Sequence, residues 1–226
     1  MTQSTWIETR SGRRFDVANP REEDVHIEDI AVALAHTCRF GGHALRWISV
    51  GWHSVVVHDV VAMLCDHRDT RLAALLHDAA EAYVGDMPRP LKLAFPNFVL
   101  AENKVQDIIH QKFGLQPSEE IRTLIRKVDN QALLEEARAY MATGGRGWEL
   151  LDEGLTIPGA AFVPDCPRDF HEVAKQFLAR FHAAFCPPED TPGLPNRPPE
   201  RCSTAPLHQE IATPDRKLPP NPAPRK

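Results

Sequence analysis

The sequence of 226 residues predicts an all-α fold, and three observations carry that prediction. Apolar residues recur at helical spacing in one segment after another. Glycine and proline stand between these segments, where they end helices. Only the first 20 residues suggest a strand, around Phe15-Asp16-Val17. Hydrophobic residues make up 42% of the chain and charged residues 25%, which is ordinary for a soluble globular protein.

The first half of the chain contains three predicted helices. The second of them, residues 49–65, is apolar nearly all round, so we expect it at the centre of the domain. Its β-branched content makes a strand conceivable, but its length favours a helix. The three helices are 27–38, ended by Gly41-Gly42; 49–65; and 70–83, capped by Asp69-Thr70 and ended by Gly85, Pro88 and Pro90.

The second half contains three more predicted helices. Two of them begin at a proline or serine that suits a first turn, and a glycine ends one of them. A Gly/Pro-rich connection, residues 143–167, precedes the last helix, whose apolar stripe is explained by core packing. These helices are 96–113, ended by Gly114; a helix that begins at Pro117-Ser118 and continues past Leu133; and 170–185.

Proline marks the domain boundary. Of the 20 prolines, 12 lie in residues 187–226, which contain few large apolar side chains. Proline removes backbone donors, and so little apolar surface does not offset the entropy of ordering the chain. We therefore expect a folded domain over residues 1–186 and a disordered Pro-rich tail over 187–226.

Charge and composition exclude several classes of protein. The net charge of −5 disfavours a nucleic-acid binder, which needs a positive surface. No apolar run reaches the roughly 18 residues of a membrane span, and the first 14 residues lack a secretion signal. The five cysteines are scattered without metal-binding or redox spacing, which fits free thiols in a reducing cytoplasm. Self-association into a homo-oligomer stays open.

Four polar residues stand where the helical pattern predicts core. His53 shares a face with Val57 and Val60, and Asp129 follows Ile125 by one turn. His77-Asp78 is embedded in an apolar stretch. A buried carboxylate without a partner costs several kcal/mol, so we expect cationic groups to face Asp78 and Asp129.

Each of these residues has an ordinary explanation when taken alone. A single His on an apolar face is usually a hydrogen-bonded core residue, and Asp129 could pair with Arg126 or with an Arg of another helix. An adjacent His-Asp pair occurs by chance. Together, however, two imidazoles and two carboxylates form a ligand set for one divalent cation, and this set suits Zn, Mn, Co or Fe.

The order His53, His77-Asp78, Asp129 resembles the H…HD…D signature of HD-domain phosphohydrolases. Residues 77–92, HDAAEAYVGDMPRPLK, are similar to the H-D-x-x-E-x-x-x-G-D-x-P-x-P-x-K run of bacterial 5′-deoxynucleotidases. Residues 27–43 resemble phage- and prophage-encoded members, among them phage dATP triphosphohydrolases. The likeness covers about residues 8–140 and implies an HD-domain helical bundle. One departure is Trp52, since many relatives have an acidic or amide residue before the first metal histidine.

The resemblance also implies roles for residues around the metal. Glu81 would act as general acid/base or orient water, and we expect it one helical turn after His77. Arg39 would bind phosphate, with Phe40 packing on the sugar or base. The G-D-x-P loop would contact the nucleotide. The remaining candidates for catalysis or substrate binding are Asp86, Met87, Pro88, Arg89, Lys92 and His43.

The sequence favours a single metal ion. Two-metal HD enzymes need additional histidines between the HD pair and the last Asp, and only His110 lies there. We expect one divalent ion (Co, Mn, Zn, Mg or Fe) and release of phosphate from deoxynucleoside 5′-monophosphates. The alternatives are triphosphohydrolysis of a dNTP and, in another class, a non-catalytic nucleotide-binding HD module. Intact Glu81 and Asp86 argue against the last.

The tail gives a first testable prediction. A chain that ends at Phe185 should keep the melting temperature and the activity of the full chain, because residues 187–226 contribute little apolar surface. Thermal unfolding and phosphate release by both chains measure this. Loss of folding on truncation would show instead that the tail packs on the domain or on a second copy.

Overall fold

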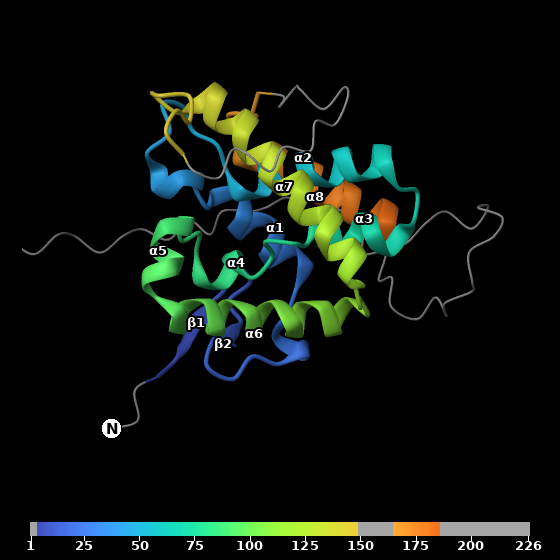
Figure 1. Cartoon of the computed structure of the whole chain (residues 1–226). Coiled ribbons are helices and arrows are strands. Elements are labelled where there is room, and N and C mark those ends of the chain that lie inside the picture. The colour runs from blue at the N-terminus through green and yellow to red at the C-terminus, as the bar shows by residue number, and fades with distance from the viewer. Residues whose placement is uncertain (1–3, 149–164, 186–226) are drawn as a thin grey trace, which may run out of the picture. The chain divides into compact units, whose positions relative to one another are not determined.

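The computed structural model describes residues 4–148 and 165–185. In this part of the chain the fold is mostly helical, as predicted, with one small β-hairpin (Figure 1). The elements are β1 (Trp6–Glu8), β2 (Arg14–Asp16), η1 (Glu22–Asp24), α1 (Ile27–His36), η2 (Arg39–Gly42), α2 (Val50–Leu64), α3 (Arg68–Leu75), α4 (Glu81–Val84), α5 (Arg89–Ala94), α6 (Pro96–Phe113), α7 (Glu119–Tyr140) and α8 (Phe170–Phe185).

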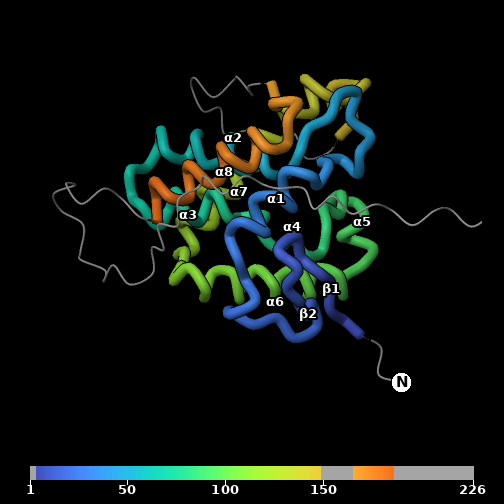
Figure 2. The backbone as a smooth tube through the Cα atoms, turned by 180° about the vertical axis from the view of Figure 1, so that it is seen from behind, coloured from blue at the N-terminus to red at the C-terminus, as the bar shows by residue number. Residues whose placement is uncertain are grey.

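Helix α2 lies at the centre of the core and packs against α1, α3, α7 and α8. Figure 2 shows α8 running over α2 and α3 on the face opposite to that seen in Figure 1. The prediction of a central buried helix is confirmed, although Met63 and Leu64 at its end are exposed. Gly51 permits the close approach to α1, because a Cβ there would lie 3.0 Å from the backbone nitrogen of Ala35.

Local signals set several of the helix ends. The Ser49 hydroxyl accepts a hydrogen bond from the Trp52 amide at the start of α2, and Ser118 caps α7 in the same way. Gly114 ends α6 in the left-handed conformation. The hairpin pairs Ile7 with Phe15, which confirms the predicted strand. These ends could be predicted from the sequence because each depends on residues that are adjacent in the chain.

The prediction of one continuous helix over residues 70–83 was wrong. The helix begins at Arg68, with no side-chain cap from Asp69-Thr70, and stops at Leu75 before α4 resumes at Glu81. The side chain of Gln106, on α6, explains the break. Its amide nitrogen donates to the Leu76 carbonyl at 2.7 Å, and its oxygen accepts from the Ala80 amide at 3.0 Å. Gln106 thus replaces the helical hydrogen bond between these two residues.

Two further differences concern the predicted boundaries. Helix α5 was not predicted, because Pro88 and Pro90 suggested only a helix end. Proline is tolerated in a first helical turn, and here Pro90 occupies that place.

The predicted tail, 187–226, and residues 149–164 of the predicted connection lie outside the described residues. In the described part, none of the helices combines the length and apolar character required to cross a bilayer.

Candidate metal centre

Three of the four predicted metal ligands converge at one point. Ligand atoms of His53 on α2, His77 after α3 and Asp129 on α7 all lie within 4.8 Å of one another. The shortest separation joins His53 Nε2 to Asp129 Oδ1 at 3.1 Å, and His77 Nε2 lies 4.0 Å from the same oxygen. Residues up to 76 positions apart in sequence therefore present their polar atoms to one small volume.

Asp78 lies at the same cluster. Its Oδ2 is 3.1 Å from His77 Nε2 and 3.8 Å from His53 Nε2. His77 and Asp78 both lie in the turn at residues 76–80, between α3 and α4. The structure thus brings together all four residues that the sequence singled out.

Hydrogen bonds set the orientation of both imidazoles. His77 Nδ1 donates to the Ala74 carbonyl at 2.9 Å, and His53 Nδ1 donates to Glu136 Oε1 at 2.8 Å. When both imidazoles are neutral, the Nε2 atom of each ring therefore carries a lone pair, which faces the carboxylates. His77 Nε2 is buried and lacks a hydrogen-bond partner among the described residues.

These donor atoms fit a divalent cation. Two imidazole lone pairs and two carboxylates repel one another unless a proton or a metal ion lies between them. Neutral imidazole held by a carboxylate or a carbonyl on its far nitrogen is the usual arrangement of a metal-bound histidine. The set of two nitrogens and two oxygens suits a first-row transition metal.

Glu136 was missed by the sequence analysis. It is fully buried, and each of its two oxygens has a different partner: Oε1 accepts from His53 Nδ1, and Oε2 lies 2.8 Å from Arg39 Nε. It follows Asp129 by seven residues, which puts both carboxylates on one face of α7. That spacing was a readable signal, since the intervening Ala132 is also buried.

Arg39 is buried beside this cluster. Its guanidinium pairs with Glu136 and lies 3.9 Å from Asp78 Oδ2, so it supplies the cation expected near Asp78. Burial disfavours its charge, but the carboxylates of Glu136, Asp129 and Asp78 raise its pKa further above the usual value. It is followed by Phe40, whose φ of 56° is left-handed. This strained turn is stabilised by the packing around it.

The charges of the cluster shift one another's pKa values. Burial and the charge of Arg39 disfavour protonation of His53, yet Glu136 and Asp129 outweigh both and raise its pKa to about 10. Burial raises the pKa of Asp78, but His77, His53 and Arg39 outweigh it and hold that pKa well below its usual range. Without a metal, a proton on His53 therefore holds the carboxylates together.

Comparisons with known proteins agree with this geometry. Residues 50–155 match the model of the HD domain, a range that contains all four cluster residues. The chain is 34% identical over 178 residues to the uncharacterized protein YfdR of Escherichia coli (strain K12), covering 79% of this chain and 94% of the relative.

The chain belongs to the HD-domain family. A second relative, an uncharacterized protein of Rhodobacter capsulatus, is 38% identical over 115 residues, which cover 49% of this chain and 59% of that protein. HD domains bind divalent metals and are in general hydrolases, and the family indicates a metal-dependent phosphohydrolase here. The identity of the metal is a separate question.

Glu81 belongs to a second buried group beside the HD cluster. It begins α4 rather than continuing a helix from His77, so the predicted helical relation between the two is wrong. Lys92 Nζ lies 3.2 Å from Glu81 Oε1 and 2.8 Å from Glu102 Oε1, while Glu81 Oε2 is buried without a hydrogen bond from the described residues. Burial and the charges of Asp78 and Asp86 raise the pKa of Glu81 well above its usual value.

The other predicted binding residues lie on two loops. His43 is exposed at the end of η2, and Asp86, Met87 and Pro88 are half-buried between α4 and α5. The loops approach each other, because a Cβ on Gly41 would lie 3.6 Å from the Pro88 ring.

On α5, Arg89 is exposed. Its Nη2 lies 3.8 Å from Asp129 Oδ2 and donates to Asn130 Oδ1 at 3.0 Å. The cation near Asp129 is therefore Arg89, while Arg126 pairs with Glu119 instead.

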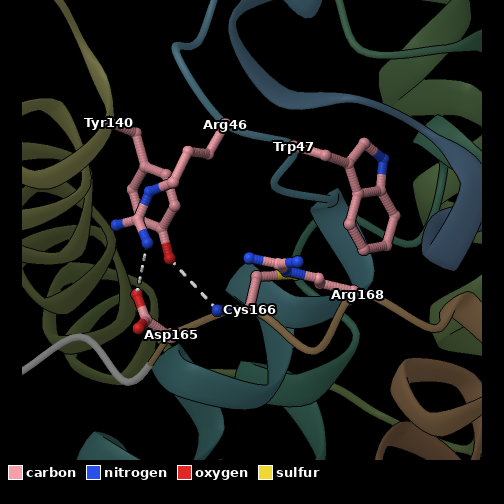
Figure 3. A pocket seen from close by; sticks show the side chains of 6 residues that line it. All are labelled: Arg46, Trp47, Tyr140, Asp165, Cys166 and Arg168. Atoms are coloured by element: carbon pink, nitrogen blue, oxygen red, sulfur yellow. Dashed lines mark hydrogen bonds and ion pairs between the residues drawn. The ribbon is translucent and has the colours of Figure 1, made fainter.

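A pocket of about 420 Å³ lies beyond Glu136, at the end of α7 (Figure 3). The Tyr140 hydroxyl accepts a hydrogen bond from the Cys166 amide at 3.1 Å, and Arg46 pairs with Asp165 at 3.1 Å. Figure 3 shows Trp47 and Arg168 on the opposite side of this pocket. It shares no lining residue with the HD cluster, so it is a separate feature.

A smaller pocket, of about 240 Å³, reaches the cluster itself. His77 and Asp129 form part of its wall, together with residues of α3, α6, α7 and the loop between α6 and α7. The other lining residues are Ala73, Gln106, His110, Pro117, Arg122, Ile125 and Arg126.

The contacts of Glu136 predict a loss of metal binding when its charge is removed. Glu136→Gln should lower metal affinity about 10- to 100-fold, because residues that orient a ligand histidine have effects of this size. Metal titration after EDTA treatment measures it. Glu135→Gln is a matched control, since Glu135 contacts Gln131 and Arg138 outside the cluster. Equal affinity of both variants would contradict the assigned role.

The raised pKa of His53 predicts how stability depends on pH. Protonated His53 stabilises the metal-free fold fully below its unfolded pKa of 6.5, and this stabilisation is lost as pH rises toward 10. Urea unfolding in EDTA should therefore show falling stability from pH 6.5 to 9. Saturating metal, which needs neutral His53, should reduce that slope. A constant or rising stability in EDTA would contradict this account.

Proposed function

We propose that this chain is a metal-dependent phosphohydrolase that acts on nucleotides and releases phosphate from deoxynucleoside 5′-monophosphates. The observation that carries the proposal is the convergence of His53, His77, Asp78 and Asp129, with a buried arginine at its edge. The choice of a deoxynucleotide rests on the resemblance of residues 77–92 to the 5′-deoxynucleotidase run. A metal held by the four residues would polarise the phosphoryl group and bind the attacking water.

Arg39 would position the phosphate. Its guanidinium is already paired with Glu136 through Nε, and its Nη1 lies 3.9 Å from Asp78 Oδ2. A planar guanidinium can contact two phosphate oxygens at once, which an ammonium group cannot do. Phe40 and His43 would then lie beside the bound nucleotide, opposite the loop of Asp86, Met87 and Pro88.

Glu81 would hold and transfer a proton. Its raised pKa favours the protonated acid near neutral pH. Because Lys92 binds Oε1, we assign the proton to Oε2, which is not engaged by a described residue. A protonated carboxyl next to the cluster suits donation to the leaving nucleoside oxygen.

A second candidate is triphosphohydrolysis of a dNTP. It uses the same metal ligands, and the basic pocket that reaches His77 and Asp129 favours it. A non-catalytic nucleotide-binding HD module is a third candidate of a different class. The buried oxygen Glu81 Oε2, which has no hydrogen bond from the described residues, argues against that module. An unsatisfied buried oxygen lowers the stability of the fold, and a protein that only binds nucleotides has no use for it.

A product analysis distinguishes the three candidates. The protein is treated with EDTA, reloaded with single divalent metals and incubated with dNMPs and dNTPs. Release of inorganic phosphate and deoxynucleoside supports the monophosphatase, and release of tripolyphosphate supports the second candidate. Binding without turnover for every metal would leave the non-catalytic module.

Mutants of Glu81 and Arg39 should fail in different ways. Glu81→Ala should lower kcat about 10²- to 10⁴-fold with metal affinity retained, because it removes the proton donor. Arg39→Lys should raise KM, lower kcat, or both, because it loses the planar fork. Both are measured at saturating metal, with Glu135→Gln as control. Wild-type turnover by Glu81→Ala would refute the proton-transfer role.

A further inference from the structure

We propose that Arg122 and Arg126 form a polyphosphate-binding subsite that extends from the HD cluster along α7. They line the 240 Å³ pocket whose wall includes His77 and Asp129. The choice of a nucleoside triphosphate as ligand rests on the second candidate of the proposed function, the dNTP, because a dNMP carries only one phosphate. None of the binding residues predicted from sequence lines this pocket, so the subsite is additional to them.

The spacing of the pocket residues suits an extended anion. Arg122, Arg126 and Asp129 lie at intervals of four and three residues, which put them on one face of α7. Arg122 stands seven residues from Asp129, or roughly 10 Å along the helix axis. An anion with one phosphate at the cluster would therefore pass Arg126 and then reach Arg122.

The charge of the pocket favours an anion outside the cluster. Among its lining residues Asp129 is the only acid, and it belongs to the metal set. Burial and the charge of Arg122 lower the pKa of His110, so the positive charge here comes from the two arginines. His110 is neutral and is held by the Gln106 amide at 2.9 Å.

The arginines are available to a ligand. Arg122 donates through Nε to the Pro117 carbonyl at 3.1 Å, and its terminal nitrogens make no hydrogen bond or ion pair with the described residues. Arg126 pairs with Glu119 at 3.3 Å, but both side chains are mostly exposed. Exposed ion pairs are weak, so a phosphate can replace Glu119 as the partner of Arg126.

The test uses the full chain and inorganic tripolyphosphate as probe. In EDTA, calorimetric titration should show binding that weakens about three- to tenfold in Arg122→Ala and in Arg126→Ala. Lys127→Ala is the matched control, because it removes the same charge from the next position of α7 without lining the pocket. Higher salt should weaken wild-type binding more than binding to the double arginine variant.

A kinetic arm distinguishes a nucleotide from free polyphosphate. At saturating metal, the double variant should raise the KM or inhibition constant of a dNTP about tenfold or more and change that of a dNMP less than twofold. If the arginine substitutions weaken the binding of free tripolyphosphate but not of the dNTP, the subsite binds inorganic polyphosphate rather than the nucleotide ligand proposed here.

Two results would overturn the subsite. One is equal tripolyphosphate affinity of the double variant and Lys127→Ala. The other is an equal loss for dNMP and dNTP, which would indicate a general field effect. Arginine-dependent tripolyphosphate binding by a protein that hydrolyses no nucleotide would instead refute the proposed function and leave the subsite standing.

Discussion

The sharing of one buried carboxylate between an imidazole and a guanidinium holds the site together. Glu136 is fully buried and contacts both His53 and Arg39 at 2.8 Å. Removing this carboxylate would take away the nearest partner of the buried Arg39 guanidinium, and an unpaired buried charge costs several kcal/mol. The shared contact aims His53 Nε2 at Asp129 and holds Arg39 near Asp78. A single side chain of α7 thus links the central helix α2 to the strained turn after α1.

The second constraint is the interruption of a helix by a side chain from another helix. Gln106 takes over the hydrogen bond that would join Leu76 and Ala80. His77 and Asp78 lie in the resulting turn, where His77 Nε2 is 3.1 Å from Asp78 Oδ2. Gln106 bonds to both backbone groups, so the interruption leaves neither of them without a hydrogen bond.

The surroundings of the cluster differ on its two sides. On the side of η2 and α5 the described cations are Arg39, Lys92 and Arg89, and two of these are tied to buried carboxylates. Toward the end of α6 and the start of α7 the cations are Arg122 and Arg126, which are held only by a carbonyl and an exposed acid. Cations fixed by the fold suit positioning of a group, and less constrained cations suit variable or extended anions.

By itself, the sequence determined the helical fold class, the central position of residues 50–64, several helix ends and the four cluster residues. Each depends on local patterning: apolar spacing, adjacent caps, or a polar residue on an apolar face. Only the tertiary structure decided the break at Leu76–Ala80, the sharing of Glu136 and the pairing of Glu81 with Lys92. These depend on contacts between distant helices, and helical periodicity carries no information about which side chain of α6 or α7 will meet a given turn.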